Sequence, residues 1–265
     1  MATAVPLPYE RPDEPEIDHL ITEDDAPVDF ASQIQARLLV GSLYAGGWQG
    51  PPPAEDGRPR PFLAAANVGL FATPYESPIV PDALVSLDVV PQAPIWEKKN
   101  RSYFIWVFGK APELVVEIVS NREGDELGDK LLRYARMRIT YYVVYDPAGH
   151  LGGPTLHTFA LRDGRYAPID PWFPALGLGV REQEGEFEGV RARWLRWHTR
   201  DGAVLPTGGE RADVEKQRAE VEKQRAEVEK QRAEVEKQRA DTAEARAERL
   251  RERLRAAGID PDADR

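Results

Sequence analysis

The feature that most constrains the fold is a seven-residue repeat near the C-terminus. The sequence Ala-(Glu/Asp)-Val-Glu-Lys-Gln-Arg occurs four times without interruption between Ala212 and Arg239. Its residues other than valine are good helix formers, and no glycine or proline occurs between Glu210 and Ala257. At about 1.5 Å per residue, the repeat predicts one continuous helix roughly 70 Å long over residues 210–257.

The repeat leaves open whether this helix pairs with another. Each heptad carries one large apolar residue, a valine, whereas a strong coiled coil needs two. Alanine and leucine then recur at alternating steps of four and three residues from Ala243 to Ala257. We therefore expect weak self-association in the last turns, with the helix ending at Gly258. The alternative is a lone charged helix that acts as a spacer.

Charge is distributed unevenly along the 265-residue chain, whose formal net charge is −10. Residues 1–30 hold nine acidic side chains and one arginine, whereas residues 31–209 are close to neutral. We expect an acidic leader over residues 1–29 that is a solvated appendage, or alternatively a tail that competes with a polyanion. The near-neutral remainder lacks the basic surface of a constitutive nucleic-acid binder.

The composition and motifs exclude several classes of protein. The chain has no cysteine, which rules out disulfides, thiolate metal sites and cysteine nucleophiles. Phosphate-loop, nucleophile-elbow and paired-histidine metal motifs are missing. No apolar run approaches the roughly 18 residues of a spanning helix, and no signal peptide is evident. We therefore expect a soluble, cytoplasmic protein without membrane contact.

The middle of the chain alternates helix-like and strand-like segments. Apolar residues at helical spacing predict helices at residues 30–44 and 125–138. Strands are predicted at 62–66, 83–90, 103–108, 114–119 and 141–145, followed by a hairpin of 155–161 and 165–169. This order predicts an α/β or α+β domain with a mixed sheet. The predicted parts are the leader (1–29), this domain (30–205), the long helix (210–257) and a tail (258–265).

Glu117 is the candidate for a functional carboxylate because of its surroundings. It lies in a run that is apolar on both faces, Leu114–Val119 (LVVEIV), as in a central strand. An unpaired carboxylate there costs several kcal/mol or keeps its proton. A second carboxylate, Asp82, opens the predicted strand at 83–90, and two converging carboxylates suit a hard cation such as Mg²⁺. Alternatively, Glu117 pairs with a buried arginine or lysine and Asp82 ends a turn.

Four short segments carry a combined pattern: Pro81-Asp82, the Glu117 strand (LVVEIVS), GDKLLRYAR at 128–136 and YYVVYDP at 141–147. Together they resemble the Uma-type family of restriction endonucleases, which belongs to the PD-(D/E)xK nuclease superfamily. The resemblance covers about residues 30–200. It implies a restriction-endonuclease-like sheet flanked by helices, and a divalent cation, Mg²⁺ or Mn²⁺, held by Asp82 and Glu117.

The sequence departs from the superfamily pattern at one position. The superfamily usually has a lysine two residues after the acid, and here that position is Val119. Lys130, on the following predicted helix, is the candidate for a displaced lysine that orients a water or stabilises the phosphate oxyanion. The alternative is an ordinary surface lysine. Ser120 and Arg122 are candidates for contacts to the waters of the metal or to a phosphate, or they cap the loop.

These features predict a metal-dependent endonuclease that cuts DNA, with Asp82, Glu117 and Lys130 as its catalytic residues. The alternative is a catalytically weak or inert family member that acts through its long helix as a binding or assembly module. We expect a homo-oligomer, formed through the superfamily fold or through the C-terminal helix.

Overall fold

The structure is a computed structural model, and it describes residues 16–17, 19–20, 29–45, 48–53, 57–121 and 125–258. Arg122 lies outside the described residues, as do nearly all of the acidic leader and of the C-terminal tail. The chain divides into two compact units, residues 1–208 and 209–265. No helix in the described part of the chain is both long enough and apolar enough to cross a membrane.

A six-stranded mixed sheet forms the centre of the first unit. Its strands, in spatial order, are β1 (Phe62–Ala66), β3 (Ala83–Leu87), β5 (Leu114–Ile118), β6 (Tyr141–Tyr145), β7 (Leu156–Arg162) and β8 (Arg165–Pro168). β5 and β6 are parallel, and the other neighbours are antiparallel. Every residue of β3, β5 and β6 is buried, as in strands covered on both faces. The predicted mixed sheet and its final hairpin are confirmed.

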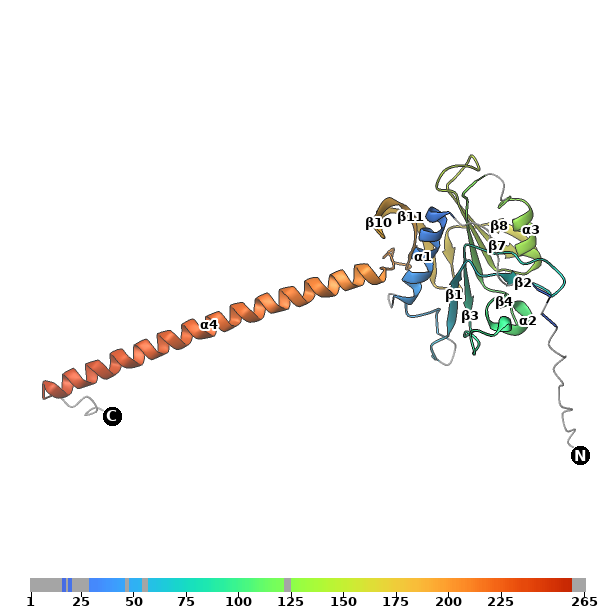
Figure 1. Cartoon of the computed structure of the whole chain (residues 1–265). Coiled ribbons are helices and arrows are strands. Elements are labelled where there is room, and N and C mark those ends of the chain that lie inside the picture. The colour runs from blue at the N-terminus through green and yellow to red at the C-terminus, as the bar shows by residue number, and fades with distance from the viewer. Residues whose placement is uncertain are drawn as a thin grey trace, which may run out of the picture. The chain divides into compact units, whose positions relative to one another are not determined.

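Smaller elements complete the described part of the first unit. Its helices are α1 (Phe30–Tyr44), α2 (Ile105–Phe108) and α3 (Asp129–Arg136), with a 3₁₀ turn at Lys98–Asn100. A parallel pair joins β2 (Leu70–Phe71) and β4 (Tyr103–Phe104), and an antiparallel sheet joins β9 (Trp172–Phe173), β10 (Leu178–Phe187) and β11 (Val190–His198). In Figure 1, α1 lies beside β11 and α3 beside β8.

Two apolar clusters cover the two faces of the central sheet. Alternate residues of a strand point to opposite faces, so that Val116 of β5 packs in one cluster and Val115 in the other. The first cluster includes residues of α1 and of β9, β10 and β11. The second includes Tyr134 of α3 and Tyr142 of β6. Because Glu117 has the same parity as Val115, its side chain is on the face of the second cluster.

α1 is fixed to β11 by paired hydrogen bonds. The amide of the buried Gln35 donates to the Leu195 carbonyl at 2.9 Å and accepts from the Leu195 N–H at 2.9 Å. The side chain of Asp29 caps the helix by accepting from the Ser32 N–H at 3.0 Å. The predicted helix over residues 30–44 is confirmed with the same bounds.

Three predicted elements have clearly different bounds than expected. The strand predicted over residues 83–90 ends at Leu87. Only Tyr103–Phe104 of the predicted strand 103–108 is a strand, because Ile105–Phe108 form a short helix that ends at Gly109 with φ 73°. A short apolar run is compatible with either a strand or a helix, because it is too short to show the periodicity of one or the other. The helix predicted over 125–138 begins only at Asp129, because a turn that starts at Asp125 (φ 47°) precedes it.

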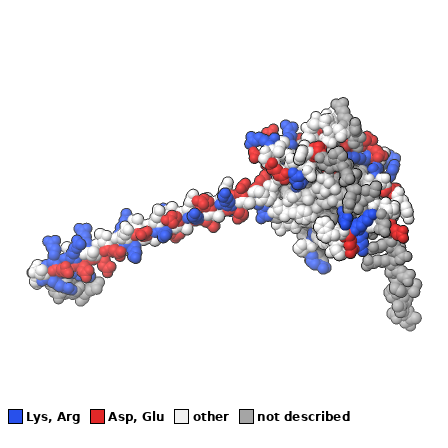
Figure 2. All heavy atoms as spheres, viewed as in Figure 1, with Lys and Arg blue, Asp and Glu red and all other residues white. Residues whose placement is uncertain are grey.

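In the part of the second unit that the structure describes, nearly all residues belong to α4 (Gly208–Ala256), a single helix of 49 residues. None of the helix residues is buried, and its four repeat valines are each 47–49% exposed. Figure 2 shows acidic and basic side chains alternating along it. The long helix predicted from the heptad repeat is confirmed, and its self-association stays a prediction.

Candidate active site

Asp82 and Glu117 lie on neighbouring strands at the same end of the central sheet. The antiparallel register of β3 and β5 pairs Ala83 with Val116, and the same register continued by one residue sets Asp82 opposite Glu117. Residues directly opposite each other in an antiparallel pair point to the same face. Oδ2 of Asp82 also accepts a hydrogen bond of 2.6 Å from the Ile118 N–H. The sheet thus brings the two predicted carboxylates together.

Glu117 is 2% exposed, and both of its carboxylate oxygens have hydrogen-bond donors. The Tyr134 hydroxyl donates to Oε1 at 2.5 Å, and Nζ of Lys130 donates to Oε2 at 2.9 Å. Both donors come from α3, where a spacing of four residues places them on the same face. The pairing of Glu117 with an arginine or lysine, which the sequence leaves as the alternative to a metal site, is therefore present. The partner is Lys130, the residue proposed from the sequence as the displaced catalytic lysine.

Lys130 lies between two buried carboxylates, and its side chain is only 26% exposed. Besides its contact with Glu117, its Nζ is 3.3 Å from Oε1 of Glu126, a residue that is 5% exposed. Glu126 is not among the candidate residues predicted from the sequence. The signal that could have found it is its position four residues before Lys130 on the same predicted helix.

The turn before α3 sets the positions of Glu126 and Lys130. Oδ2 of Asp125 accepts from the Asp129 N–H at 2.8 Å, and the carbonyl of Asp125 accepts from the Gly128 N–H at 3.0 Å. A Cβ built on Gly128 would lie 2.2 Å from Oδ1 of Asp125. A glycine at this position therefore lets the chain close tightly onto the carboxylate that starts the helix.

Burial and charge change the proton affinities of this cluster. Burial, and after it the charge of Glu117, raises the pKa of Asp82 to about 7. Burial also raises the pKa of Glu117, although Lys130 and Tyr134 oppose the shift. Burial alone lowers the pKa of Lys130, but the neighbouring carboxylates, chiefly Glu117, outweigh it and raise the pKa overall. Both acidic groups are thus poorly compensated as anions.

A cavity of about 1320 Å³ opens at this end of the sheet, lined by Asp82, Glu117, Glu126, Lys130 and Ser120. The start of α1, residues of β11 and the segments 67–80 and 147–150 also contribute to its lining. Its volume exceeds the roughly 300–1,000 Å³ of small-ligand pockets. Ser120 is exposed, whereas the other candidate for a phosphate contact, Arg122, lies outside the described residues.

The carboxylates of the cavity fit a hard divalent cation. Within the described ranges, no group of three or more Asp, Glu, His or Cys side chains is arranged to hold a metal ion. Mg²⁺, however, is commonly bound by one or two carboxylates and retains several waters. Asp82 and Glu117 supply such a pair, and the raised pKa of each shows that its anion would gain from a nearby positive charge.

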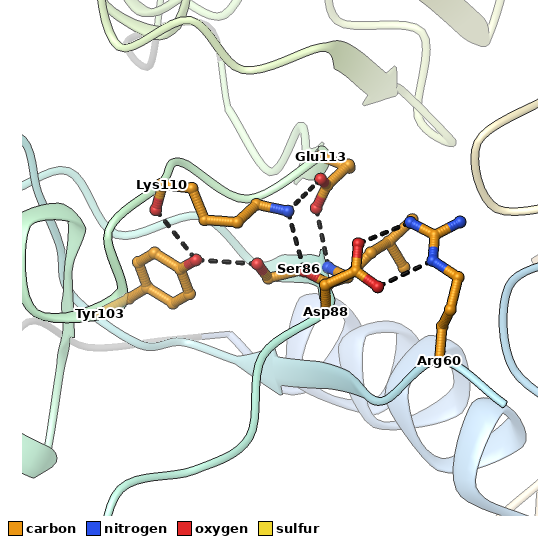
Figure 3. A network of polar contacts seen from close by, with 7 residues as sticks. Arg60, Ser86, Asp88, Tyr103, Lys110 and Glu113 are labelled. Atoms are coloured by element: carbon orange, nitrogen blue, oxygen red, sulfur yellow. Dashed lines mark hydrogen bonds and ion pairs between the residues drawn. The ribbon is translucent and has the colours of Figure 1, made fainter. Parts of the chain in front are cut away.

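A second polar network lies at the opposite ends of β3 and β5 (Figure 3). Lys110 pairs there with Oε1 of Glu113, and Oε2 of Glu113 accepts from the Leu87 N–H at 2.7 Å. The hydroxyl of Tyr103 is 2.8 Å from Oγ of Ser86. This network offers a lysine–glutamate pair in the segment that directly precedes β5, away from the cavity.

The comparisons with known proteins give one match. A family model described as "Uma2: Putative restriction endonuclease" matches residues 26–181. No curated protein and no solved structure matches the chain. The matched region contains the whole Asp82, Glu117, Glu126 and Lys130 cluster, does not reach α4, and covers more than half of the chain. The chain therefore belongs to the Uma2 family of restriction-endonuclease-type proteins.

Proposed function

We propose that this protein is a divalent-cation-dependent DNA endonuclease, in which Asp82 and Glu117 bind the cation and Lys130 acts on the phosphate. The observation that carries the proposal is that these three side chains, which all belong to the region matched by the restriction endonuclease family, line one cavity. The size of the cavity supports a polymeric substrate.

The residues of the cluster would have different roles in phosphodiester hydrolysis. Mg²⁺ or Mn²⁺, when bound, would polarise the phosphate and lower the pKa of a water. Asp82 and Glu117 would hold the cation, with the main-chain carbonyl near Ile118 as a further ligand. Because both carboxylates come from the ends of central strands, their positions are fixed before the substrate binds. Lys130 would orient the attacking water or stabilise negative charge on the phosphate.

Cleavage of plasmid DNA with Mg²⁺ or Mn²⁺ tests the proposal. We expect Asp82→Ala, Glu117→Ala and Lys130→Ala each to lower the rate by about 100-fold or more. The matched control is Glu113→Ala, which removes a glutamate from the other end of β5 and should keep the activity. Cation-dependent cleavage that survives Glu117→Ala would contradict the assignment of the site.

The alternative, a catalytically inert family member, makes a different prediction for the cation. If the cluster serves the fold alone, Mn²⁺ gives neither heat in calorimetry nor an increase in the unfolding temperature. Binding of Mn²⁺ by the wild type, and its loss in Asp82→Ala, supports the nuclease proposal independently of the choice of DNA.

The charge pattern of α4 favours a second role, in assembly. With the repeat valines at the a positions of a heptad, every e position of the repeat is arginine and every g position is acidic. The e positions are Arg218, Arg225, Arg232 and Arg239, and the g positions are Asp213, Glu220, Glu227 and Glu234. In a parallel pair, each g residue faces the next e residue of the partner helix, so opposite charges meet. In an antiparallel pair, like charges meet. We infer that α4 pairs in parallel with the same helix of a second copy.

A further inference from the structure

We propose that Glu126 is a positioning residue: it retains Lys130 in the cavity when a divalent cation binds to the carboxylate of Glu117. The inference rests on the proposed function. Glu126 is not among the catalytic or metal-binding residues predicted from the sequence.

The first observation is that neither oxygen of Glu117 is free of a donor. Oε1 accepts from the Tyr134 hydroxyl, and Oε2 accepts from Nζ of Lys130. Tyr134 is neutral and fully buried, so it can stay in place beside a cation. An ammonium and a divalent cation on the same carboxylate repel each other strongly in a buried site. A cation on Glu117 therefore requires Lys130 to withdraw from Oε2.

The second observation identifies the acceptor toward which Lys130 can withdraw. Oε1 of Glu126 is 3.3 Å from Nζ, against 2.9 Å for Oε2 of Glu117. The other oxygen of Glu126 is buried and has no hydrogen-bond partner among the described residues. Because only one oxygen of this buried carboxylate has a donor among these residues, and that contact is long, its negative charge gains from a closer approach of the Nζ ammonium. No other side-chain carboxylate is found paired with Lys130 in the described part of the chain.

The third observation is that Glu126 is held while Lys130 can move. The carbonyl of Glu126 accepts a hydrogen bond of 2.9 Å from the buried hydroxyl of Tyr142, and the residue is 5% exposed. Lys130 has a flexible four-carbon stem and a compact charge with three donors. The lysine can therefore pass from one fixed carboxylate to the other without leaving the cavity, where the proposed reaction needs its charge.

A double-mutant cycle on Mn²⁺ binding, measured by calorimetry on the full-length protein, tests this role. In Glu126→Gln, Lys130 has Glu117 as its carboxylate partner. Mn²⁺ must then displace Lys130 from Glu117 without a second carboxylate to accept the ammonium. We expect the Kd for Mn²⁺ to rise at least about tenfold, as for other residues that orient a metal site. Glu126→Asp, which keeps the charge one methylene further away, should lie between wild type and Glu126→Gln.

The same substitution made in Lys130→Gln distinguishes two roles of Glu126, positioning of Lys130 and direct binding of the cation. In Lys130→Gln there is no ammonium to retain, so adding Glu126→Gln should change the Kd by less than about twofold. An equal loss of affinity in both backgrounds would show that Glu126 acts on the cation itself and would overturn the inference. An unchanged affinity in both backgrounds would overturn it as well.

Two controls complete the experiment. Glu113→Gln removes the glutamate partner of Lys110 at the other end of β5 (Figure 3) and should leave the Kd for Mn²⁺ unchanged. Thermal unfolding of each variant establishes that it is folded. A wild type that binds no Mn²⁺ contradicts the proposed function together with this inference, whereas the outcomes of the cycle described above bear on Glu126 alone.

Discussion

The hydroxyl of Tyr134 on α3 donates a hydrogen bond of 2.5 Å to Oε1 of Glu117 on β5, in the apolar interior of the first unit. This contact links the helix to the strand at Glu117. Among the described strands of the central sheet, Glu117 is the one buried carboxylate. It fixes the direction of that carboxylate, while its second oxygen faces Lys130. The geometry of the candidate site thus depends on the packing of α3 on the sheet.

Replacing Tyr134 by phenylalanine should affect both stability and cation binding. Without its donor, Oε1 of Glu117 is buried and unsatisfied, which lowers the free energy of unfolding by about 1–3 kcal/mol. Because the carboxylate is then less well oriented, we expect the Kd for Mn²⁺ to rise about tenfold. Urea denaturation and calorimetry measure the two effects.

The control for this variant is Tyr103→Phe. Tyr103 is equally buried, and its hydroxyl contacts Ser86 in the network at the other end of the sheet. Tyr103→Phe should lower stability but leave Mn²⁺ affinity unchanged. Equal changes of Mn²⁺ affinity in both variants would mean that the effect of Tyr134 is a general loss of structure.

Asp82 should make the stabilisation by Mn²⁺ dependent on pH. Its pKa is about 7 in the folded protein, against an ordinary value of 3.8. Between these values the unfolded chain releases the proton that the folded protein keeps, so this group lowers stability as the pH rises, and the loss is complete above about pH 7. A cation that pairs with the anion offsets this loss.

The increase in unfolding temperature on adding Mn²⁺ should therefore be larger at about pH 7.5 than at about pH 6. Thermal unfolding with and without Mn²⁺ at both pH values measures the difference. Asp82→Asn, which has no proton to release, should abolish it. A wild type stabilised equally at both pH values would argue against Asp82 as a ligand.

Gln35→Ala should destabilise the contact between α1 and β11. The substitution leaves the N–H and the carbonyl of Leu195 without the amide that pairs with both. We expect the free energy of unfolding to fall by about 2–4 kcal/mol, because buried polar groups lose their partners. Gln33→Ala, at an exposed position of the same helix, should change it by less than about 0.5 kcal/mol in urea denaturation.

Charge reversal on α4 tests the parallel pairing of two copies. The combined substitutions Glu220→Lys, Glu227→Lys and Glu234→Lys place lysine opposite arginine in a parallel pair, so we expect the full-length protein to sediment as a monomer. The matched control changes the same number of charges at b positions, outside the contact, with Glu222→Lys, Glu229→Lys and Glu236→Lys. It should sediment as the wild type does.

Two further measurements distinguish the orientation and the site of pairing. Because the chain has no cysteine, Val221→Cys introduces a single thiol, which oxidation should join to its equivalent in a parallel pair. Truncation after Thr207 removes α4 and should give a monomer. A truncated protein that keeps the oligomeric state of the full chain would assign assembly to the first unit.

The sequence predicted elements best where a periodic pattern repeats over several turns. α1 spans the predicted residues 30–44 because its apolar positions recur at helical spacing. Residues 105–108, in contrast, form a helix inside a predicted strand, since a short apolar run suits either conformation. The strands β9, β10 and β11 were not predicted, although they supply much of the apolar cover of one sheet face.

For the candidate site, the sequence singled out the carboxylates but not all the groups around them. Asp82 and Glu117 are conspicuous because a charge in an apolar strand is unfavourable, and Lys130 was suggested by the resemblance to the family. Glu126 lies in a polar stretch and Tyr134 on an ordinary helix face, where their residue types indicate nothing unusual. Tyr134 reaches Glu117 through the packing of α3 against β5, and the turn before α3 places Glu126 beside Lys130.

The amino-acid sequence by itself determined the long charged helix and the placement of an acid within a central strand, because both follow from local patterns along the chain. Only the tertiary structure decided which groups surround that acid. Strand register sets Asp82 opposite Glu117, and the packing of α3 brings in Lys130 and Tyr134. Such contacts join residues far apart in the chain, and they depend on how the whole fold buries its apolar surface.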